Sequence, residues 1–373
     1  MMFAMTDTDP RDVLAALLRG EHVSGAGRDA FNACLREQLT GLVYEQFVRD
    51  PGCCDWPAEI REELARRARA AVAIEVARQQ EIAAVLDRLA ADGVTPILFK
   101  GTALAYSTYG APSLRPRSDT DLIVRRSDVD AVSRVMTALG YARPPHSGGE
   151  LLFRQFWLER RDHNGVMHAF DVHWRVSTQP AFADLLSYEE LAADAVAVPA
   201  LGVHARAAGP LHALLLACIH PVMHHRNDER LLWIYDIHVL ARTLPAADLA
   251  RLADLAIVKR MAAVTAAGLS RARDRLATPL PGNLVERLRA SAAVEPSAVY
   301  LQPNRRWTHD LVASLRALPR WRDRLHLLRE VAFPAGHYML HAYGLGRSAT
   351  PLLPVLYSHR ILRGAWQMLG RRK

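Results

Sequence analysis

The sequence predicts an α+β protein in which a small mixed β-sheet core with helices is flanked by two large all-α regions. Short apolar runs bounded by turn residues, which are typical of strands, are confined to the middle of the chain. On both sides, apolar residues recur every three or four positions, as on one face of a helix. We therefore divide the chain into an N-terminal helical region (residues 1–92), an α/β core (93–200) and a C-terminal helical region (201–373).

Helical periodicity in the N-terminal region covers residues 10–50 and resumes at 58–92, after a break between two prolines. The second stretch is rich in Ala, Arg and Glu and predicts one long helix. This helix is expected to end at Asp92-Gly93, because glycine commonly follows the last helical residue. We expect it to pack against the sheet or to connect the sheet to the helical part.

In the core, strand-like and helical segments alternate, which predicts a small mixed sheet with helices on one face. Asn164-Gly165 favours a tight hairpin between the last two expected strands. The expected strands span residues 95–99, 120–124, 151–158 and 167–176, and the expected helices span 102–109 and 128–139.

The C-terminal region has helical periodicity almost throughout. Pro221 is expected to kink or split the first of its helices, because proline removes a backbone N–H donor. Beyond residue 295 the helical pattern is interrupted by several prolines. The clearest expected helices span residues 211–225, 229–243, 246–255, 262–276 and 284–292.

The composition is that of an ordinary globular protein, with 50% hydrophobic and 23% charged residues. The formal net charge of +8 would suit an anionic partner, but we favour a weak excess spread over a large surface. The four cysteines match no zinc or redox spacing, and neither a signal peptide nor a transmembrane run is read. These features lead us to expect a cytoplasmic protein.

Two aspartates two residues apart, Asp119 and Asp121, come just before an apolar run. In a strand, such residues point to the same face, where their charges repel unless a cation lies between them. Asp171 lies in the middle of another expected strand, where aspartate is disfavoured, and an adjacent strand could bring it beside the other two. An Asp-x-Asp pair alone is a weak signal, since a turn or a helix cap has the same pattern.

The order of these motifs resembles the nucleotidyltransferase superfamily related to DNA polymerase β, and more narrowly a bacterial family of uncharacterised nucleotidyltransferases. In that family a Lys-Gly pair opens a helix, an Arg-x-Asp-x-Asp segment follows, and a third Asp lies in an Asp-x-His-Trp-like strand. The resemblance spans about residues 90–245, and one departure from the wider superfamily is Thr in place of Ser after the glycine. The matching residues are Lys100-Gly101, Arg117, Asp119, Asp121, Asp171-Val172-His173-Trp174 and, in the helical part, Trp233 to His238.

The resemblance implies transfer of NMP from an NTP, for example ATP, to a hydroxyl or phosphate of an unknown acceptor, which could be a small molecule, a protein or an RNA. It implies that Asp119, Asp121 and Asp171 are catalytic and hold Mg²⁺, or Mn²⁺ in its place. Other enzymes with an Asp-x-Asp motif, such as haloacid-dehalogenase-type phosphatases and glycosyltransferases, fit the order of the elements less well.

Four residues around the glycine turn would bind the triphosphate. Gly101 lets the backbone approach closely, and Thr102 can donate to a phosphate oxygen at the N-terminus of a helix. Lys100 or Arg117 could neutralise phosphate charge. The resemblance also makes Asp236 a candidate for substrate binding, and His173 could bind substrate or orient Asp171.

A different class of protein remains open, namely a non-catalytic nucleotide- or RNA-binding protein of the same fold, for example in a toxin–antitoxin system or a biosynthetic gene cluster. Two other features have ordinary interpretations that we favour. A histidine cluster could form a zinc site, but we favour histidines that hydrogen-bond within the protein. Residues 355–373 could contact a membrane surface, but we favour a helix that packs on its own domain and ends in a basic tail. The cluster consists of His220, His224 and His225, with Asp236 and His238 nearby.

Overall fold

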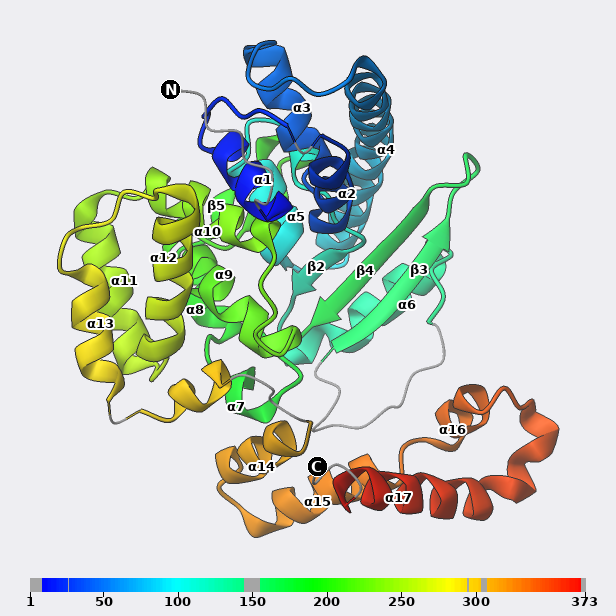
Figure 1. Cartoon of the computed structure of the whole chain (residues 1–373). Helices are drawn as coiled ribbons and strands as arrows, with labels where there is room; N and C mark the ends of the chain where they lie inside the picture. The colour runs from blue at the N-terminus through cyan, green and yellow to red at the C-terminus, as the bar shows by residue number, and fades with distance from the viewer. Residues whose placement is uncertain (1–8, 26, 144–154, 294, 303–306, 370–373) are drawn as a thin grey trace.

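The structure is a computed structural model that describes residues 9–25, 27–143, 155–293, 295–302 and 307–369. It is mainly helical, with one mixed sheet of six strands in its middle (Figure 1). The mixed α+β class predicted from the sequence is therefore confirmed. Among the described residues, no helix is long and apolar enough to cross a membrane.

The sheet has the strand order β3-β4-β2-β1-β6-β5. β2 pairs in parallel with β4 and antiparallel with β1, while β3 and β4 form an antiparallel hairpin. The strands are β1 (Ile97–Leu98), β2 (Thr120–Ile123), β3 (Gln155–Arg161), β4 (Met167–His173), β5 (Val196–Ala197) and β6 (Arg206–Ala207).

The strand predictions differ from the structure in three respects. The first strand is shorter than expected, and the third begins at Gln155 because the preceding residues of the expected segment, 151–154, lie outside the described residues. β5 and β6 were not predicted, since two residues are too few to show alternation. β6 lies in a part of the chain where only helices were expected.

In the N-terminal region, α4 is one continuous helix, as predicted. Its C-terminal half buries Ile82, Val85 and Leu86 in the core cluster that contains the sheet. Its N-terminal half buries Ile60 and Leu64 in the second, mainly helical cluster, so α4 joins the two. The helices are α1 (Pro10–Leu18), α2 (Gly27–Glu37), α3 (Thr40–Arg49) and α4 (Ala58–Ala91).

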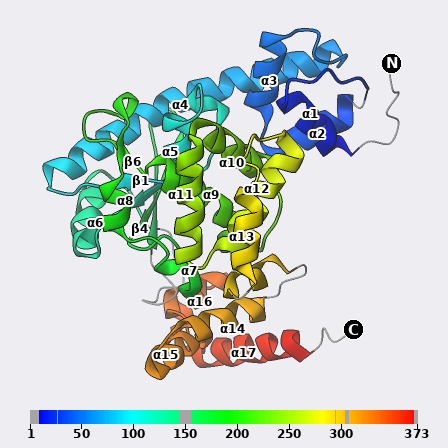
Figure 2. The ribbon, with the colours of Figure 1, turned by 90° about the vertical axis from the view of Figure 1, so that its left-hand side faces the viewer.

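Both faces of the sheet are covered, so the expectation of helices on one face was wrong. Alternate strand residues enter different clusters, because side chains along a strand point to opposite faces. Leu98 and Leu122 pack with α4 and α6, whereas Ile97 and Ile123 belong to the cluster that contains α9 and α10. α6 and the C-terminal helices accordingly lie on opposite sides of the sheet (Figure 2).

The helices for which ranges were expected in the core and in the C-terminal region agree closely with them, whereas α7 and α8 of the core were not predicted. Pro221 lies in the last turn of α9 and does not split it. The helices of the core are α5 (Lys100–Ser107), α6 (Val129–Ala138), α7 (Pro180–Ala183) and α8 (Tyr188–Ala193). They are followed by α9 (Pro210–His224), α10 (Leu231–Thr243), α11 (Ala246–Val258), α12 (Ala262–Leu276), α13 (Leu284–Ala292), α14 (Trp307–Ala317), α15 (Trp321–Ala332), α16 (Gly336–Ala342) and α17 (Leu353–Leu369). Short 3₁₀ helices are η1 (Pro112–Leu114), η2 (Arg126–Asp128), η3 (Pro199–Leu201), η4 (Pro296–Leu301) and η5 (Arg347–Leu352).

Candidate functional site

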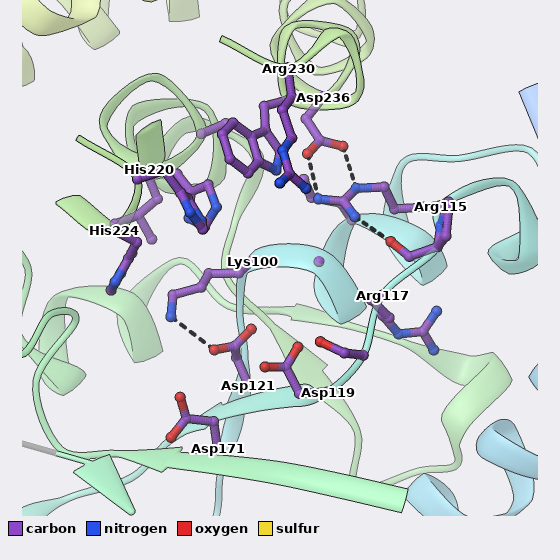
Figure 3. Close-up of a pocket in the computed structure, with 18 of the residues that line it drawn as sticks. Lys100, Arg115, Arg117, Asp119, Asp121, Asp171, His220, His224, Arg230 and Asp236 are labelled. Atoms are coloured by element: carbon purple, nitrogen blue, oxygen red, sulfur yellow. Dashed lines mark hydrogen bonds and ion pairs between the residues drawn. The ribbon is translucent and has the colours of Figure 1, made fainter. Parts of the chain in front are cut away.

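Three carboxylates meet on the sheet face that is turned towards α9 and α10. The parallel register of β2 and β4 sets Asp121 directly opposite Asp171, so their side chains lie next to each other on the same face. Asp119 lies one residue before β2, and its carboxylate points into the same space (Figure 3). The structure therefore brings together the three acids that were singled out in the sequence.

The protein environment affects the two neighbouring acids in opposite ways. Burial, together with the charge of Asp121, raises the pKa of Asp119 to about 6. Burial alone would also raise the pKa of Asp121, but Lys100 and the hydrogen bond from His173 outweigh it and lower that pKa. The cluster thus carries negative charge that is only partly balanced by the protein.

Lys100 provides the cation nearest to the acids. Its Nζ donates to Asp121 Oδ1 at 2.8 Å. The backbone of Lys100 has a φ of 55°, a left-handed conformation that costs a non-glycine residue about 1 kcal/mol. Lys100 adopts this conformation at the sharp turn from β1 into α5, and its long side chain extends from there to the acids.

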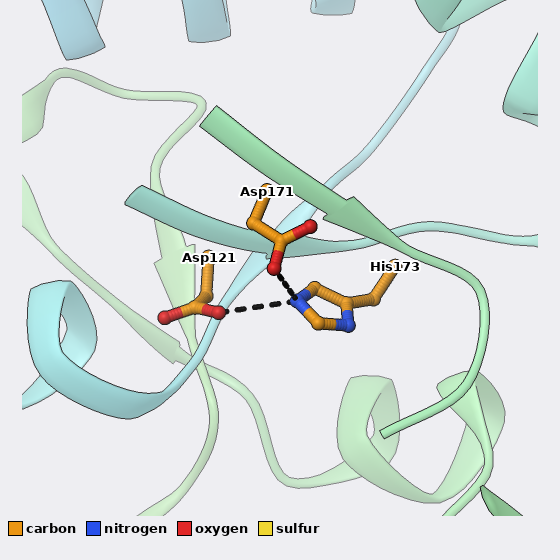
Figure 4. Close-up of side chains that lie close together, drawn as sticks. All are labelled: Asp121, Asp171 and His173. Atoms are coloured by element: carbon orange, nitrogen blue, oxygen red, sulfur yellow. Dashed lines mark hydrogen bonds and ion pairs between the residues drawn. The ribbon is translucent and has the colours of Figure 1, made fainter. Parts of the chain in front are cut away.

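His173 lies two residues after Asp171 on the same strand face and is fully buried. Its Nε2 lies 3.1 Å from Asp121 Oδ1 and 3.1 Å from Asp171 Oδ2 (Figure 4). Burial and Lys100 act to lower the pKa of His173, but the two carboxylates outweigh them and raise it. The contact to Asp171 agrees with the expectation that His173 orients this acid.

Asp121, Asp171 and His173 form the one group among the described residues whose ligand atoms are close enough together to hold a metal ion. Asp171 Oδ1 is buried and has no hydrogen-bond partner in the described structure. Gln155, which the sequence did not indicate, donates to the other oxygen of Asp171 at 2.5 Å. A buried carboxylate oxygen without a partner is costly, and a cation would satisfy it.

Two of the expected phosphate ligands are engaged within the protein instead. Thr102 is fully buried, donates to the Asp119 carbonyl at 3.2 Å and accepts from Arg117 Nε at 2.9 Å. The guanidinium of Arg117 also forms a two-pronged ion pair with Glu75 of α4, at 2.6 and 3.0 Å. In this arrangement both residues support the loop that carries Asp119.

Gly101 lines the pocket above the acids. A Cβ added there would lie 3.6 Å from Arg117 Cβ and 3.7 Å from an Arg115 nitrogen, which are ordinary contact distances. The glycine is therefore not required by the packing of the protein itself. A ligand in the pocket that approaches the N-terminus of α5 would come close to this glycine.

Asp236 lines the same pocket, but both of its carboxylate oxygens have protein partners. Arg115 donates to them at 2.7 and 2.8 Å, and the Tyr109 hydroxyl donates at 2.6 Å. This buried ion pair ties α10 to the loop before Asp119. The geometry indicates a positioning role for Asp236, and no sequence pattern indicated Arg115 as its partner.

The pocket has a volume of about 360 Å³, within the range of small-molecule sites. One side, which we call the sheet wall, consists of Lys100, Asp119, Asp121 and Asp171. The opposite side, which we call the helix wall, consists of His220 and His224 of α9 and Trp233 of α10. Figure 3 shows the two imidazoles facing the sheet wall across the pocket.

The two histidines of the helix wall are polar but uncharged, and Arg230, which packs over Trp233, lines the pocket beside them. Burial lowers the pKa of both His220 and His224 well below the ordinary value. His220 Nδ1 and His224 Nε2 are buried and lack a hydrogen-bond partner within the described residues. His225 stacks on Trp233 with ring centroids 4.2 Å apart, which fixes the back of this wall.

The zinc alternative for the histidine cluster has no support in the described part of the chain. No set of three ligand atoms in the cluster comes close enough together to hold an ion. His238 does not join the cluster, because its Nδ1 pairs with Thr278 Oγ1 at 2.9 Å. The preferred interpretation was internal hydrogen bonding, but two ring nitrogens of the cluster lack a partner in the described structure.

A mixed sheet that presents three acids beside a glycine turn at the start of a helix is an arrangement suited to binding metal ions and phosphates. A family model of uncharacterised nucleotidyltransferases matches residues 28–277, and the chain belongs to this family. The match confirms the family resemblance found in the sequence. Among curated proteins, none matches the chain.

Proposed function

We propose that the protein is a metal-dependent nucleotidyltransferase that moves NMP from an NTP to a hydroxyl or phosphate of an acceptor. The observation that carries this proposal is the meeting of Asp119, Asp121 and Asp171 in one pocket of a chain that belongs to a nucleotidyltransferase family. The acceptor would be a small molecule, a protein or an RNA.

Mg²⁺ or Mn²⁺ would be held by Asp119, Asp121 and Asp171. Carboxylate oxygens are the ligands that these hard cations prefer, and the unpartnered Oδ1 of Asp171 is a free ligand atom. When bound, such ions lower the pKa of an attacking hydroxyl and stabilise the leaving oxygen of a phosphoryl displacement. His173 would position Asp121 and Asp171, since its Nε2 contacts both.

The triphosphate would lie against the N-terminus of α5. Gly101 leaves space for it, and the first backbone N–H groups of α5 point to this end of the helix. Lys100 would shift its ammonium contact from Asp121 towards a phosphate oxygen. If Asp171 does not ligate the metal, its Oδ1 would accept the proton of the acceptor.

The helix wall would receive the nucleobase or the acceptor. Its two neutral imidazoles can each donate or accept a hydrogen bond, and their unpartnered nitrogens would gain a partner from a bound ligand. Because they are uncharged, they would suit a neutral polar group better than a phosphate.

The alternative, a non-catalytic nucleotide- or RNA-binding protein, is favoured by one observation. Thr102 and Arg117 are engaged by the protein itself, which removes two of the groups expected to hold a phosphate. The two proposals differ in whether a bond to the α-phosphate is broken, so an experiment must follow that phosphate.

The test uses NTPs labelled at either the α- or the γ-phosphate, with Mg²⁺ or Mn²⁺ and fractions of cell extract as acceptors. Transfer of the α-label alone, with loss of transfer in Asp119→Ala/Asp121→Ala, supports nucleotidyl transfer. Asp274→Asn, an exposed aspartate far along the chain on α12, is the matched control. Transfer of the γ-label would instead identify a phosphoryl transferase, and saturable NTP binding without transfer of either label would favour the binding protein.

A further inference from the structure

The last four helices, α14 to α17 (residues 307–369), form a small helical unit that we call the C-terminal unit. It lies at the end of the molecule away from α1–α3 in both views (Figures 1 and 2). It is outside the stretch matched by the nucleotidyltransferase family, residues 28–277. Its own core cluster is small, with Met339, Leu340 and Leu356 buried among the described residues and a few partly buried side chains packed against them.

The net charge of the chain is concentrated towards this end of the sequence. From residue 307 to residue 373 the sequence has eleven Lys and Arg but three Asp and Glu, a formal charge of +8, of which the C-terminal unit itself (307–369) carries +5. The whole chain also carries +8, so the 306 residues before this segment are neutral in sum. The expectation of a weak excess spread over the surface was therefore wrong, and the charge marks one region.

α15 presents an apolar stripe to solvent. Trp321, Leu325 and Leu328 are spaced four and three residues apart, which places them on one face of the helix. All three are exposed, Trp321 to 65%. At 100° per residue, Arg324 lies on one side of the stripe and Arg322 on the other.

α17 presents a second stripe. Val355, Leu362 and Trp366 are spaced seven and four residues apart on one face and are exposed to 65, 69 and 74%. Leu353, Leu356 and Tyr357 pack inward with α16, so the expectation that this segment packs on its own domain holds for this face of α17 but not for the stripe. Arg363 lies beside the stripe by the same helical spacing.

The concentration of apolar side chains is not a general property of this surface. Ten of the seventeen exposed large hydrophobic side chains found in the described residues belong to the C-terminal unit. Exposed apolar patches of this kind mark interaction sites. Those of the C-terminal unit are Val312, Trp321, Leu325, Leu328, Phe333, Leu352, Val355, Ile361, Leu362 and Trp366.

We propose that the C-terminal unit docks onto a membrane surface that contains anionic lipids. Apolar stripes flanked by arginines are the pattern of helices that lie in the interface, with aliphatic and Trp side chains among the acyl chains and guanidinium groups at the phosphates. The unit lies on the membrane and does not cross it, since no described helix is long and apolar enough to span it. The positive charge of the unit would also suit an RNA, but a phosphate backbone offers no apolar surface to the exposed Leu and Val side chains.

The experiment is co-sedimentation of the full chain with vesicles of phosphatidylcholine alone, or of phosphatidylcholine with about one third phosphatidylglycerol. We expect binding to the anionic vesicles that weakens as salt is added. Leu362→Glu/Trp366→Glu and Trp321→Glu/Leu325→Glu should each weaken binding by about tenfold or more. Val203→Glu/Val258→Glu, at two exposed valines outside the unit, is the matched control and should bind as wild type.

Three results would overturn the proposal. The first is no binding to anionic vesicles at low salt. The second is vesicle binding that is unchanged in both pairs of glutamate variants but lost in Arg322→Gln/Arg363→Gln, together with equal binding to a single-stranded RNA. The third is self-association of wild type, without vesicle binding, that Leu362→Glu/Trp366→Glu abolishes, which would make a second copy the occupant. All variants lie at exposed positions, and circular dichroism checks their folding.

Discussion

The sheet wall of the pocket is charged, whereas the two histidines of the helix wall opposite it are polar but neutral. On the sheet wall, three acids share one lysine and one histidine, and Asp171 Oδ1 is left without a partner in the described structure. On the helix wall, burial keeps the pKa values of His220 and His224 low, so their imidazoles stay uncharged at neutral pH. In the proposed function, the sheet wall would bind the metal-bound phosphate of a substrate, and the histidines of the helix wall would bind a neutral polar group.

The two walls also differ in how they are built. The sheet wall is held by local strand register and by the Thr102–Arg117–Glu75 chain of hydrogen bonds. The helix wall packs on the sheet through the apolar core cluster, and a buried ion pair, Arg115 with Asp236, adds a polar connection. The following changes act on one wall or on this connection, and they run from the largest expected effect to the smallest.

Removing the acids of the sheet wall should have the largest effect. Asp119→Ala/Asp121→Ala should lower nucleotidyl transfer by about 10⁴-fold or more, because the metal ligands act as a unit. The measurement is pyrophosphate release from an NTP with Mn²⁺, beside the Asp274→Asn control. Activity within tenfold of wild type would remove the sheet wall from the proposed chemistry.

Removing the ion pair that connects the two walls should mainly lower the free energy of unfolding. Arg115→Met leaves Asp236 buried without its ion-pair partner, and the free energy of unfolding should fall by about 3 kcal/mol. Urea denaturation measures this loss. Asp236→Asn in the same background should recover part of it, because the unpaired charge is gone. If Asp236 instead binds substrate directly, Asp236→Asn alone would weaken NTP binding at unchanged stability.

Filling the space beside the sheet wall should affect the ligand and not the fold. Gly101→Ala places a methyl group at ordinary contact distances and adds helix propensity, so stability should be equal or slightly higher. NTP binding should weaken by about tenfold, since the methyl group enters the space left for the triphosphate. Gly110→Ala, where nothing lies within 4 Å of the new Cβ, is the control. Equal NTP affinity in both variants would place the triphosphate elsewhere.

The smallest effect on nucleotidyl transfer is expected from the pH dependence of the helix wall, which acts on stability. Because burial lowers the pKa of His220 and His224 in the folded state, the unfolded chain takes up protons first as pH falls below about 6.5. Their contribution to stability is present above that pH and is lost as pH falls, by about 1.4 kcal/mol per pH unit for each histidine. The charged or titratable groups that face them are Lys100, Arg115, His173 and His225.

The check is the free energy of unfolding at pH 7.5 and 5.5 for wild type and for His220→Gln/His224→Gln. The acid cluster titrates in both proteins, so the difference between them isolates the histidines. The variant should lose less stability on acidification. An equal loss in the two proteins would mean that these histidines are not kept neutral by the fold.

The grouping of the acids on the sheet wall could be predicted from sequence in part because it depends on short-range rules. Asp119 and Asp121 are two residues apart, and Asp171 stood out as an acid within a strand pattern. The family resemblance supplied the remaining link. The helices were predictable for the same reason, since their periodicity is local.

The partners of the candidate residues were not predictable, because they come from distant parts of the chain. Glu75 lies on α4, 42 residues before Arg117, and Asp236 lies 121 residues after Arg115. Single-sequence patterns carry no signal for such pairs, so Arg117 and Asp236 were read as ligand-binding residues when the structure gives both of them protein partners. β5 and β6, each two residues long, were not predicted.

The most direct test of the central claim, that the sheet wall holds divalent metal for an NTP, is a Mn²⁺ titration followed by electron paramagnetic resonance, with and without NTP. We expect wild type to remove free Mn²⁺ from solution saturably and more tightly with NTP present. Asp119→Ala/Asp121→Ala should lose this binding, while Asp274→Asn keeps it. Mn²⁺ binding of equal strength in wild type and in the double variant would contradict the account.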